Sequence, residues 1–77
     1  MTMKTTKYHV EARHRVPEFA IDAIATVYCE NVNGKFARSV SIDGKGFSRN
    51  YYNVDDYGAI RNFVEEHGCE MVTATFA

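Results

Sequence analysis

Residues 18–30, EFAIDAIATVYCE, decide the fold of this chain, because their pattern fits either a strand or a helix. A strand is favoured by the β-branched and aromatic residues of the stretch and by the Asn33-Gly34 pair that follows it, which is a strong hairpin signal. One face of this strand would carry Ala23, Ala25, Val27 and Cys29. We adopt the strand interpretation.

The register of that hairpin gives the strand interpretation a second support. A turn at the Asn-Gly pair places Val27 opposite Val40 and Ala25 opposite Ile42. Because the side chains of a strand alternate between two faces, this register brings two independently apolar faces together.

A helix over the same residues is the alternative interpretation. Pro17 suits the first turn of a helix, although Val16 before it is a poor N-cap. A polar stripe at a spacing of four residues would comprise Glu18, Asp22, Thr26 and Glu30. The element order would then be β-α-β-β-α-β, the pattern of ferredoxin-like domains.

The rest of the chain reads mainly as strands. Alternation with a period of two predicts them over residues 7–16, 35–43, 47–52 and 71–76. Residues 1–6 are expected to be frayed.

One amphipathic helix is predicted over residues 53–69. Asn53 can cap its start, with Asp56 three residues later, and Gly68 offers the left-handed residue that ends a helix. Gly58 costs about 1 kcal/mol relative to alanine inside a helix. We therefore expect an irregular first turn there, with close packing against Gly58 as the alternative.

These elements predict a single α+β domain over residues 1–77. Its architecture is an antiparallel four- to five-stranded sheet with one helix of the C-terminal half packed on one face. A domain of this size buries only roughly 60% of the surface that its unfolded chain exposes. Little protein remains from which to build a deep pocket, so we do not expect an enzyme.

No catalytic, cofactor or metal site is predicted. The one cluster that resembles metal ligands, or a nucleophile with its base, comprises Glu65, Glu66, His67, Cys69 and Glu70. Structural zinc needs four converging ligands, and a cysteine nucleophile needs a positioned base. This cluster supplies neither, and Cys29 and Cys69 are each assigned to packing.

Charge is divided between the two parts of the chain. Residues 1–49 carry eight basic and five acidic residues, a net charge of +3, whereas residues 50–77 carry one basic and five acidic residues, a net charge of −4. Exposed tyrosines beside an acidic patch are typical of protein-contact surfaces. We assign partner binding to Tyr51, Tyr52, Asp55, Glu65, Glu66 and Glu70.

A small nucleic-acid binder is the alternative function. Its basic sheet face would use Arg13, Arg15 and Arg49 to neutralise phosphates. Glu11 lies among these charges, and no aromatic-glycine motif of an RNA-recognition module is present. The protein-binding interpretation is therefore preferred.

In its layout, the chain resembles the small inhibitors carried by phages and other mobile elements, anti-CRISPR proteins among them. The shared features are the NG and GKG hairpins, the tyrosine-rich last hairpin, the covering helix and the acidic end. The resemblance carries over no individual residue. It implies a non-enzymatic, stoichiometric binder that blocks a host defence or nucleic-acid-handling complex.

The expected location is the cytosol, or the host cytosol if a phage encodes the chain. The chain carries only two cysteines and no apolar run of about 18 residues that could span a bilayer, and no signal peptide is recognised. We expect a protein partner and no membrane, and an exposed sheet edge could also pair with a second copy to form a homodimer.

Overall fold

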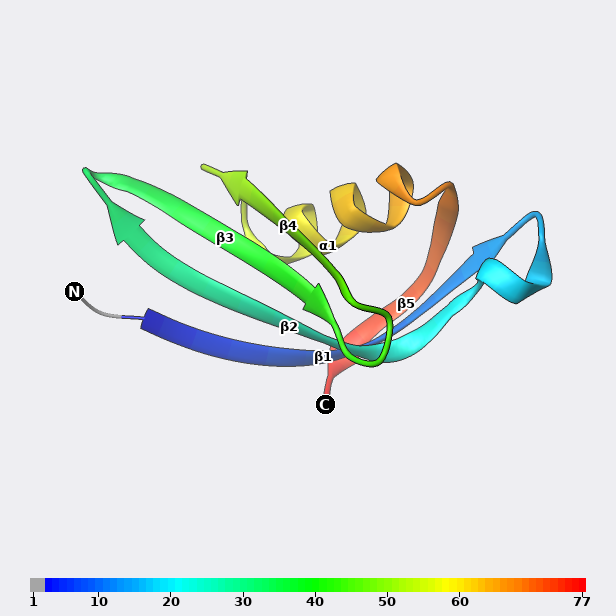
Figure 1. The fold of residues 1–77 in the computed structure, drawn as a ribbon. Coiled ribbons are helices and arrows are strands. Elements are labelled where there is room, and N and C mark those ends of the chain that lie inside the picture. The colour runs from blue at the N-terminus through cyan, green and yellow to red at the C-terminus, as the bar shows by residue number, and fades with distance from the viewer. Residues whose placement is uncertain (1–2) are drawn as a thin grey trace.

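The computed structural model describes residues 3–77 and contains a five-stranded antiparallel sheet with one helix on one face (Figure 1). The order of the strands across the sheet is β4-β3-β2-β1-β5. The elements are β1 (Met3–His14), a short 3₁₀ helix (Pro17–Phe19), β2 (Ile21–Val32), β3 (Lys35–Ile42), β4 (Phe47–Tyr52), α1 (Asp56–Glu66) and β5 (Cys69–Phe76). The predicted α+β architecture is confirmed.

Residues 18–30 form most of strand β2, so the ferredoxin-like alternative is wrong. The 3₁₀ helix that begins at Pro17 ends after three residues, where the backbone is extended again at Ala20, and its start at Val16 has no side-chain cap. In the hairpin that follows, Asn33 and Gly34 both have positive φ, at 53° and 80°. The predicted register is also confirmed, with Val27 opposite Val40 and Ala25 opposite Ile42.

Strand β1 begins earlier than the sequence predicted. Met3 pairs with Glu30 and Lys4 with Cys29 on β2, so the expected fraying of residues 1–6 is wrong for residues 3–6. Residues 1 and 2 lie outside the described residues. The long β2 supplies the neighbour that orders this end of β1.

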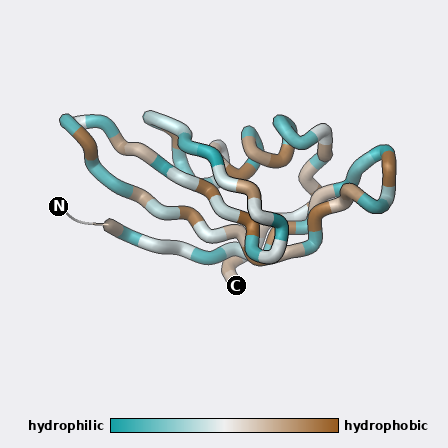
Figure 2. Tube along the Cα trace, in the orientation of Figure 1, coloured by the Kyte–Doolittle hydropathy of each residue, from teal (hydrophilic) through white to brown (hydrophobic). Residues whose placement is uncertain are grey.

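The core lies between α1 and the sheet face that it covers. Helix α1 buries Ala59, Ile60, Phe63 and Val64. The sheet contributes Tyr8, Val10, Ala12, Ile21, Ala25, Val27, Val40, Ile42, Cys69 and Ala74. Figure 2 shows the alternation of apolar and polar residues along the strands that produces one buried and one uncovered face. No helix within residues 3–77 is both long and apolar enough to cross a membrane.

The start of α1 differs from the prediction, whereas its end agrees with it. The N-cap is Asp55, whose Oδ1 accepts a hydrogen bond of 2.6 Å from the Gly58 amide. Asn53 instead has a φ of 59° and donates its amide to the Phe36 carbonyl. A Cβ on Gly58 would lie 2.7 Å from Asp55 Oδ1, so close packing, and not an irregular turn, explains this glycine. Gly68, with a φ of 72°, follows the helix end as expected.

Candidate partner-binding surface

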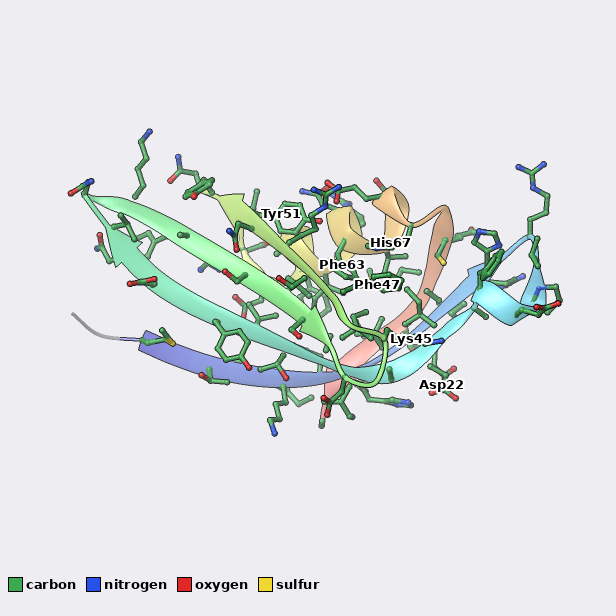
Figure 3. The ribbon with its side chains drawn as sticks, viewed as in Figure 1. Asp22, Lys45, Phe47, Tyr51, Phe63 and His67 are labelled. Carbon is green, nitrogen blue, oxygen red and sulfur yellow. The ribbon has the colours of Figure 1, made fainter. Side chains whose placement is uncertain are left out.

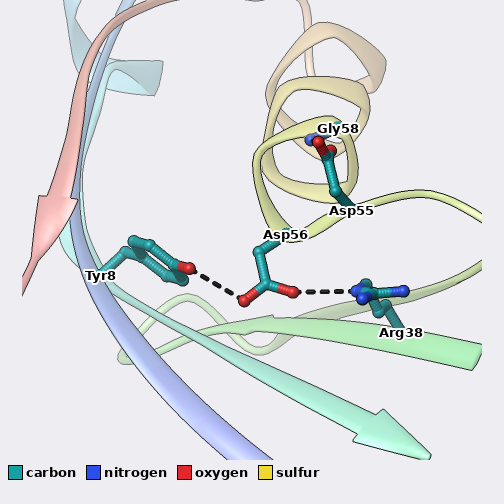
Figure 4. Close-up of polar contacts among 5 residues, drawn as sticks. All are labelled: Tyr8, Arg38, Asp55, Asp56 and Gly58. Carbon is teal, nitrogen blue, oxygen red and sulfur yellow. Dashed lines mark hydrogen bonds and ion pairs between the residues drawn. The ribbon is translucent and has the colours of Figure 1, made fainter.

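A polar cluster at Asp56 holds the first turn of α1 onto the sheet (Figure 4). The Tyr8 hydroxyl on β1 donates to Asp56 Oδ2 at 2.8 Å. Arg38 Nε on β3 donates to Asp56 Oδ1 at 2.9 Å. Both carboxylate oxygens are therefore occupied by groups from separate strands, which fixes the helix start across the sheet.

An open cleft of about 340 Å³ lies beside this cluster. Its lining comprises Lys4, Thr6, Cys29, Arg38, Asp55, Asp56 and Tyr57. Charges of both signs face it, and Asp55 and Asp56 already serve the helix start. The charges of the cleft therefore favour neither an anionic nor a cationic ligand. Its two acidic residues have a structural role at the helix start.

Burial in the core, together with the hydrogen bond to Asp56, raises the pKa of Tyr8 to about 12. The unfolded chain loses this proton near pH 10, whereas the folded chain keeps it. The contribution to stability is therefore fully present below about pH 10 and is lost as the pH rises toward 12. We expect the free energy of unfolding to fall by about 2 kcal/mol over this window, as measured by urea unfolding at several pH values.

Tyr8→Phe tests this expectation, because the variant has no proton to lose at that position. Its stability should depend less steeply on pH between 10 and 12 than that of the wild type. Tyr52→Phe removes a phenol that is 58% exposed and serves as the matched control. Equal slopes for the wild type and Tyr8→Phe would contradict the role assigned to the buried hydroxyl.

A second cluster ties β4 to the last turn of α1. Arg49 Nε and the Tyr51 hydroxyl both donate to Glu66 Oε2, each at 3.0 Å. Burial and this hydrogen bond raise the pKa of Tyr51. Tyr51 is therefore a neutral, fixed donor at neutral pH, and its ring and the Arg49 side chain are held in place beside the helix.

An aromatic stack lies next to this second cluster (Figure 3). The His67 ring packs between Phe47 and Phe63, with ring centroids 4.6 Å and 4.4 Å away. His67 Nδ1 lies 2.7 Å from the Phe63 carbonyl oxygen. His67 is thus engaged in packing and helix capping, and it does not converge with Cys69 on a metal.

The structure divides the six residues that the sequence assigned to partner binding. Tyr51 and Glu66 are in contact, and Glu65 is exposed on the same helix turn. The other three lie elsewhere: Tyr52 on the opposite face of β4, Asp55 at the far end of α1, and Glu70 on β5 at the other edge of the sheet.

The three arginines of the nucleic-acid alternative are also apart. Arg13 lies at the end of β1, opposite Glu70 on β5, and Arg15 follows this strand. Arg49 lies on the other edge strand and pairs with Glu66. These arginines therefore do not form one continuous basic platform.

The two edges of the sheet differ in how they are protected. On β5, the Tyr57 hydroxyl donates to the Ala74 carbonyl at 2.9 Å, so the helix covers part of this edge. The pairing of β5 with β1 is also irregular beside Glu11 and Ala12, as in a bulge. Both features oppose the addition of another strand to β5.

Strand β4 has an edge without such protection. Along an edge strand, the backbone amide and carbonyl of alternate residues point toward the neighbouring strand and away from it. The hydrogen bond from the Asn53 amide to the Phe36 carbonyl shows that the amides and carbonyls of Arg49 and Tyr51 point toward β3. The amides and carbonyls of Ser48, Asn50 and Tyr52 then face outward. Within residues 3–77 these outward groups have no hydrogen-bond partner. This free edge, with the Arg49-Tyr51-Glu66 cluster beside it, is the candidate surface.

The sequence left open which edge of the sheet is free. The answer depends on where the Tyr57 hydroxyl lies, and no local pattern indicates that. Sequence analysis also did not identify Arg38 as the partner of Asp56. The only signal for this role was a charged residue in an otherwise apolar strand face.

Comparison with protein-family models, with curated proteins and with solved structures finds no match for this chain.

Proposed function

We propose that this chain is a non-enzymatic protein-binding module whose partner adds a strand to the free edge of β4. The observation that carries the proposal is the row of outward backbone groups at Ser48, Asn50 and Tyr52, which have no partner within residues 3–77. Main-chain hydrogen bonds along such an edge give affinity, and the alternating side chains give specificity.

The side chains beside the edge suit this role. Arg49, Tyr51 and Glu66 are already fixed by mutual contacts, so binding would cost little further loss of side-chain freedom. Tyr52 is exposed on the other face of β4. Tyrosine and arginine are the residue types that most often dominate binding energies, and the exposed Glu65 adds negative charge at the rim.

The mode of action that we propose is blockade of a host defence or nucleic-acid-handling complex in the cytosol. The resemblance in layout to small inhibitors of phages and other mobile elements supports this mode. Glu65, an exposed acidic residue at the end of α1, would contact a basic groove that otherwise receives nucleic acid. Cys29 and Cys69 are free thiols, as is usual in a reducing compartment.

Asn50→Pro is expected to abolish partner binding and leave the fold intact. The change deletes an outward amide and places a ring in the path of an incoming strand, whereas the amides of β4 that pair with β3 remain. In a pull-down from a lysate of cells that carry the gene, the wild type should retain a specific protein that Asn50→Pro loses at least ~10-fold.

Asn50→Ala is the matched control, because it removes the side chain and its contact with Ser39 Oγ but keeps the amide. It should retain the partner. Circular dichroism of each variant establishes that it is folded. Equal recovery of the partner by folded Asn50→Pro and the wild type would refute the β4 edge as the binding surface.

A further inference from the structure

Three potential metal ligands converge on the uncovered face of the sheet, away from the surface proposed above. His9 and Glu11 are two residues apart on β1, so they share a face, and Asp22 on β2 lies directly opposite Glu11. His9 Nε2 is 2.8 Å from Asp22 Oδ1. One ligand atom of each residue lies within 4.8 Å of the other two.

The electrostatics of this trio are unfavourable without a cation. Carboxylates directly opposite one another on neighbouring strands repel each other, and Glu11 and Asp22 are such a pair. Within residues 3–77, Glu11 forms no ion pair, and Asp22 is bound only by His9, whose side chain is 42% exposed. The nearest arginine in sequence on this face, Arg13, is aligned opposite Glu70.

We propose that His9, Glu11 and Asp22 form a binding site for a divalent metal ion of the zinc type. An imidazole nitrogen combined with two carboxylate oxygens matches the ligands of Zn²⁺, whereas Ca²⁺ and Mg²⁺ favour oxygen ligands alone. Zn²⁺ holds such atoms at about 2.0–2.2 Å, which sets neighbouring ligand atoms about 3.3 Å apart. The three ligand atoms already lie within 4.8 Å of one another, so the shifts needed to reach that spacing are no more than about 1.5 Å for each pair.

Binding of the ion would replace the hydrogen bond between His9 and Asp22. The neutral His9 ring moves its proton from Nε2 to Nδ1 by exchange with solvent, the freed Nε2 lone pair binds the metal, and Nε2 and Asp22 Oδ1 move apart by about 0.5 Å. Three protein ligands leave one coordination position for water or for a group on another molecule. A shallow hollow of about 280 Å³ that Glu11, Arg13 and Asp22 help to line provides room beside this position.

Titration of the full chain with ZnCl₂, followed by isothermal calorimetry, tests the site. We expect saturable binding of one ion per chain and much weaker binding of MgCl₂ and CaCl₂. His9→Ala, Glu11→Gln and Asp22→Asn should each weaken Zn²⁺ binding by at least ~10-fold. In heteronuclear NMR spectra, the His9 ring signals should shift with added zinc, and those of His14 and His67 should not.

The zinc-free protein offers a second readout, because Glu11→Gln removes one of the two opposed carboxylates. The melting temperature of this variant should exceed that of the wild type without zinc and fall below it at saturating zinc. Glu30→Gln, a change on the same face of β2, is the control and should alter neither quantity. The proposal is overturned if the wild type binds no zinc, if the three variants bind it as well as the wild type, or if Mg²⁺ binds as tightly as Zn²⁺.

Discussion

Asp56→Ala is expected to lower the free energy of unfolding by about 3 kcal/mol. The change leaves two groups without their partner. The Tyr8 side chain is in the core, at 4% exposure, and the charged Arg38 side chain is 20% exposed. An unpaired buried hydroxyl costs about 1–3 kcal/mol, and an unpaired half-buried charge costs a similar amount or more. Urea unfolding at pH 7 provides the measurement.

Glu65→Ala is the control for this prediction, because Glu65 is an exposed acid on the same helix. Its effect should stay within about 0.5 kcal/mol. The double variant Asp56→Ala with Arg38→Met removes the stranded charge and should recover part of the loss. If Asp56→Ala costs no more than Glu65→Ala, the cluster does not fix the start of the helix.

The sheet was predictable because its information is local. The alternation of apolar and polar residues along β1 and β3, and the Asn-Gly turn, are properties of neighbouring residues. The pairing of Val27 with Val40 across the hairpin followed from them. Residues 18–30 carry both the strand period and the helix period, so their local pattern alone does not decide between the two structures. Pairing on both sides, with β1 and β3, favours the strand.

The start of α1 was predicted incorrectly because two residues can cap a helix there. Asn53 and Asp55 both have suitable side chains. The bond from the Asn53 amide to Phe36, a residue of β3, holds Asn53 in a left-handed conformation and leaves the cap to Asp55. A contact between residues so distant in sequence is not visible in the local pattern.

The candidate surfaces depend on strand order and register, which explains why they were predicted only in part. Glu70 and Tyr51 are both in the acidic, aromatic part of the chain, but β5 and β4 lie at opposite edges of the sheet. The spacing of His9 and Glu11 is visible in the sequence. Asp22 joins them only through the register of β1 with β2. That register exists only because residues 18–30 form a strand and not a helix.

Phe63→Ala is expected to lower the free energy of unfolding by about 3–5 kcal/mol, the largest loss that we predict for a single substitution in this chain. Phe63 is fully buried at 0% exposure and is among the largest fully buried side chains of the core. Its truncation costs about 3–5 kcal/mol in well-packed proteins. A domain of this length has a total stability of roughly 4–12 kcal/mol, so the loss can consume most of it.

The architecture of this domain should make the loss of stability in Phe63→Ala larger than the average for Phe→Ala substitutions. One helix covers one face of the sheet, and no second layer within residues 3–77 can close over the space that Phe63 leaves. The loss also removes one of the two rings that hold His67, which begins the turn into β5. Phe36→Ala, at a ring that is 51% exposed, should cost less than about 1 kcal/mol. If thermal unfolding followed by circular dichroism gives both variants the same melting temperature, the helix is not anchored through Phe63.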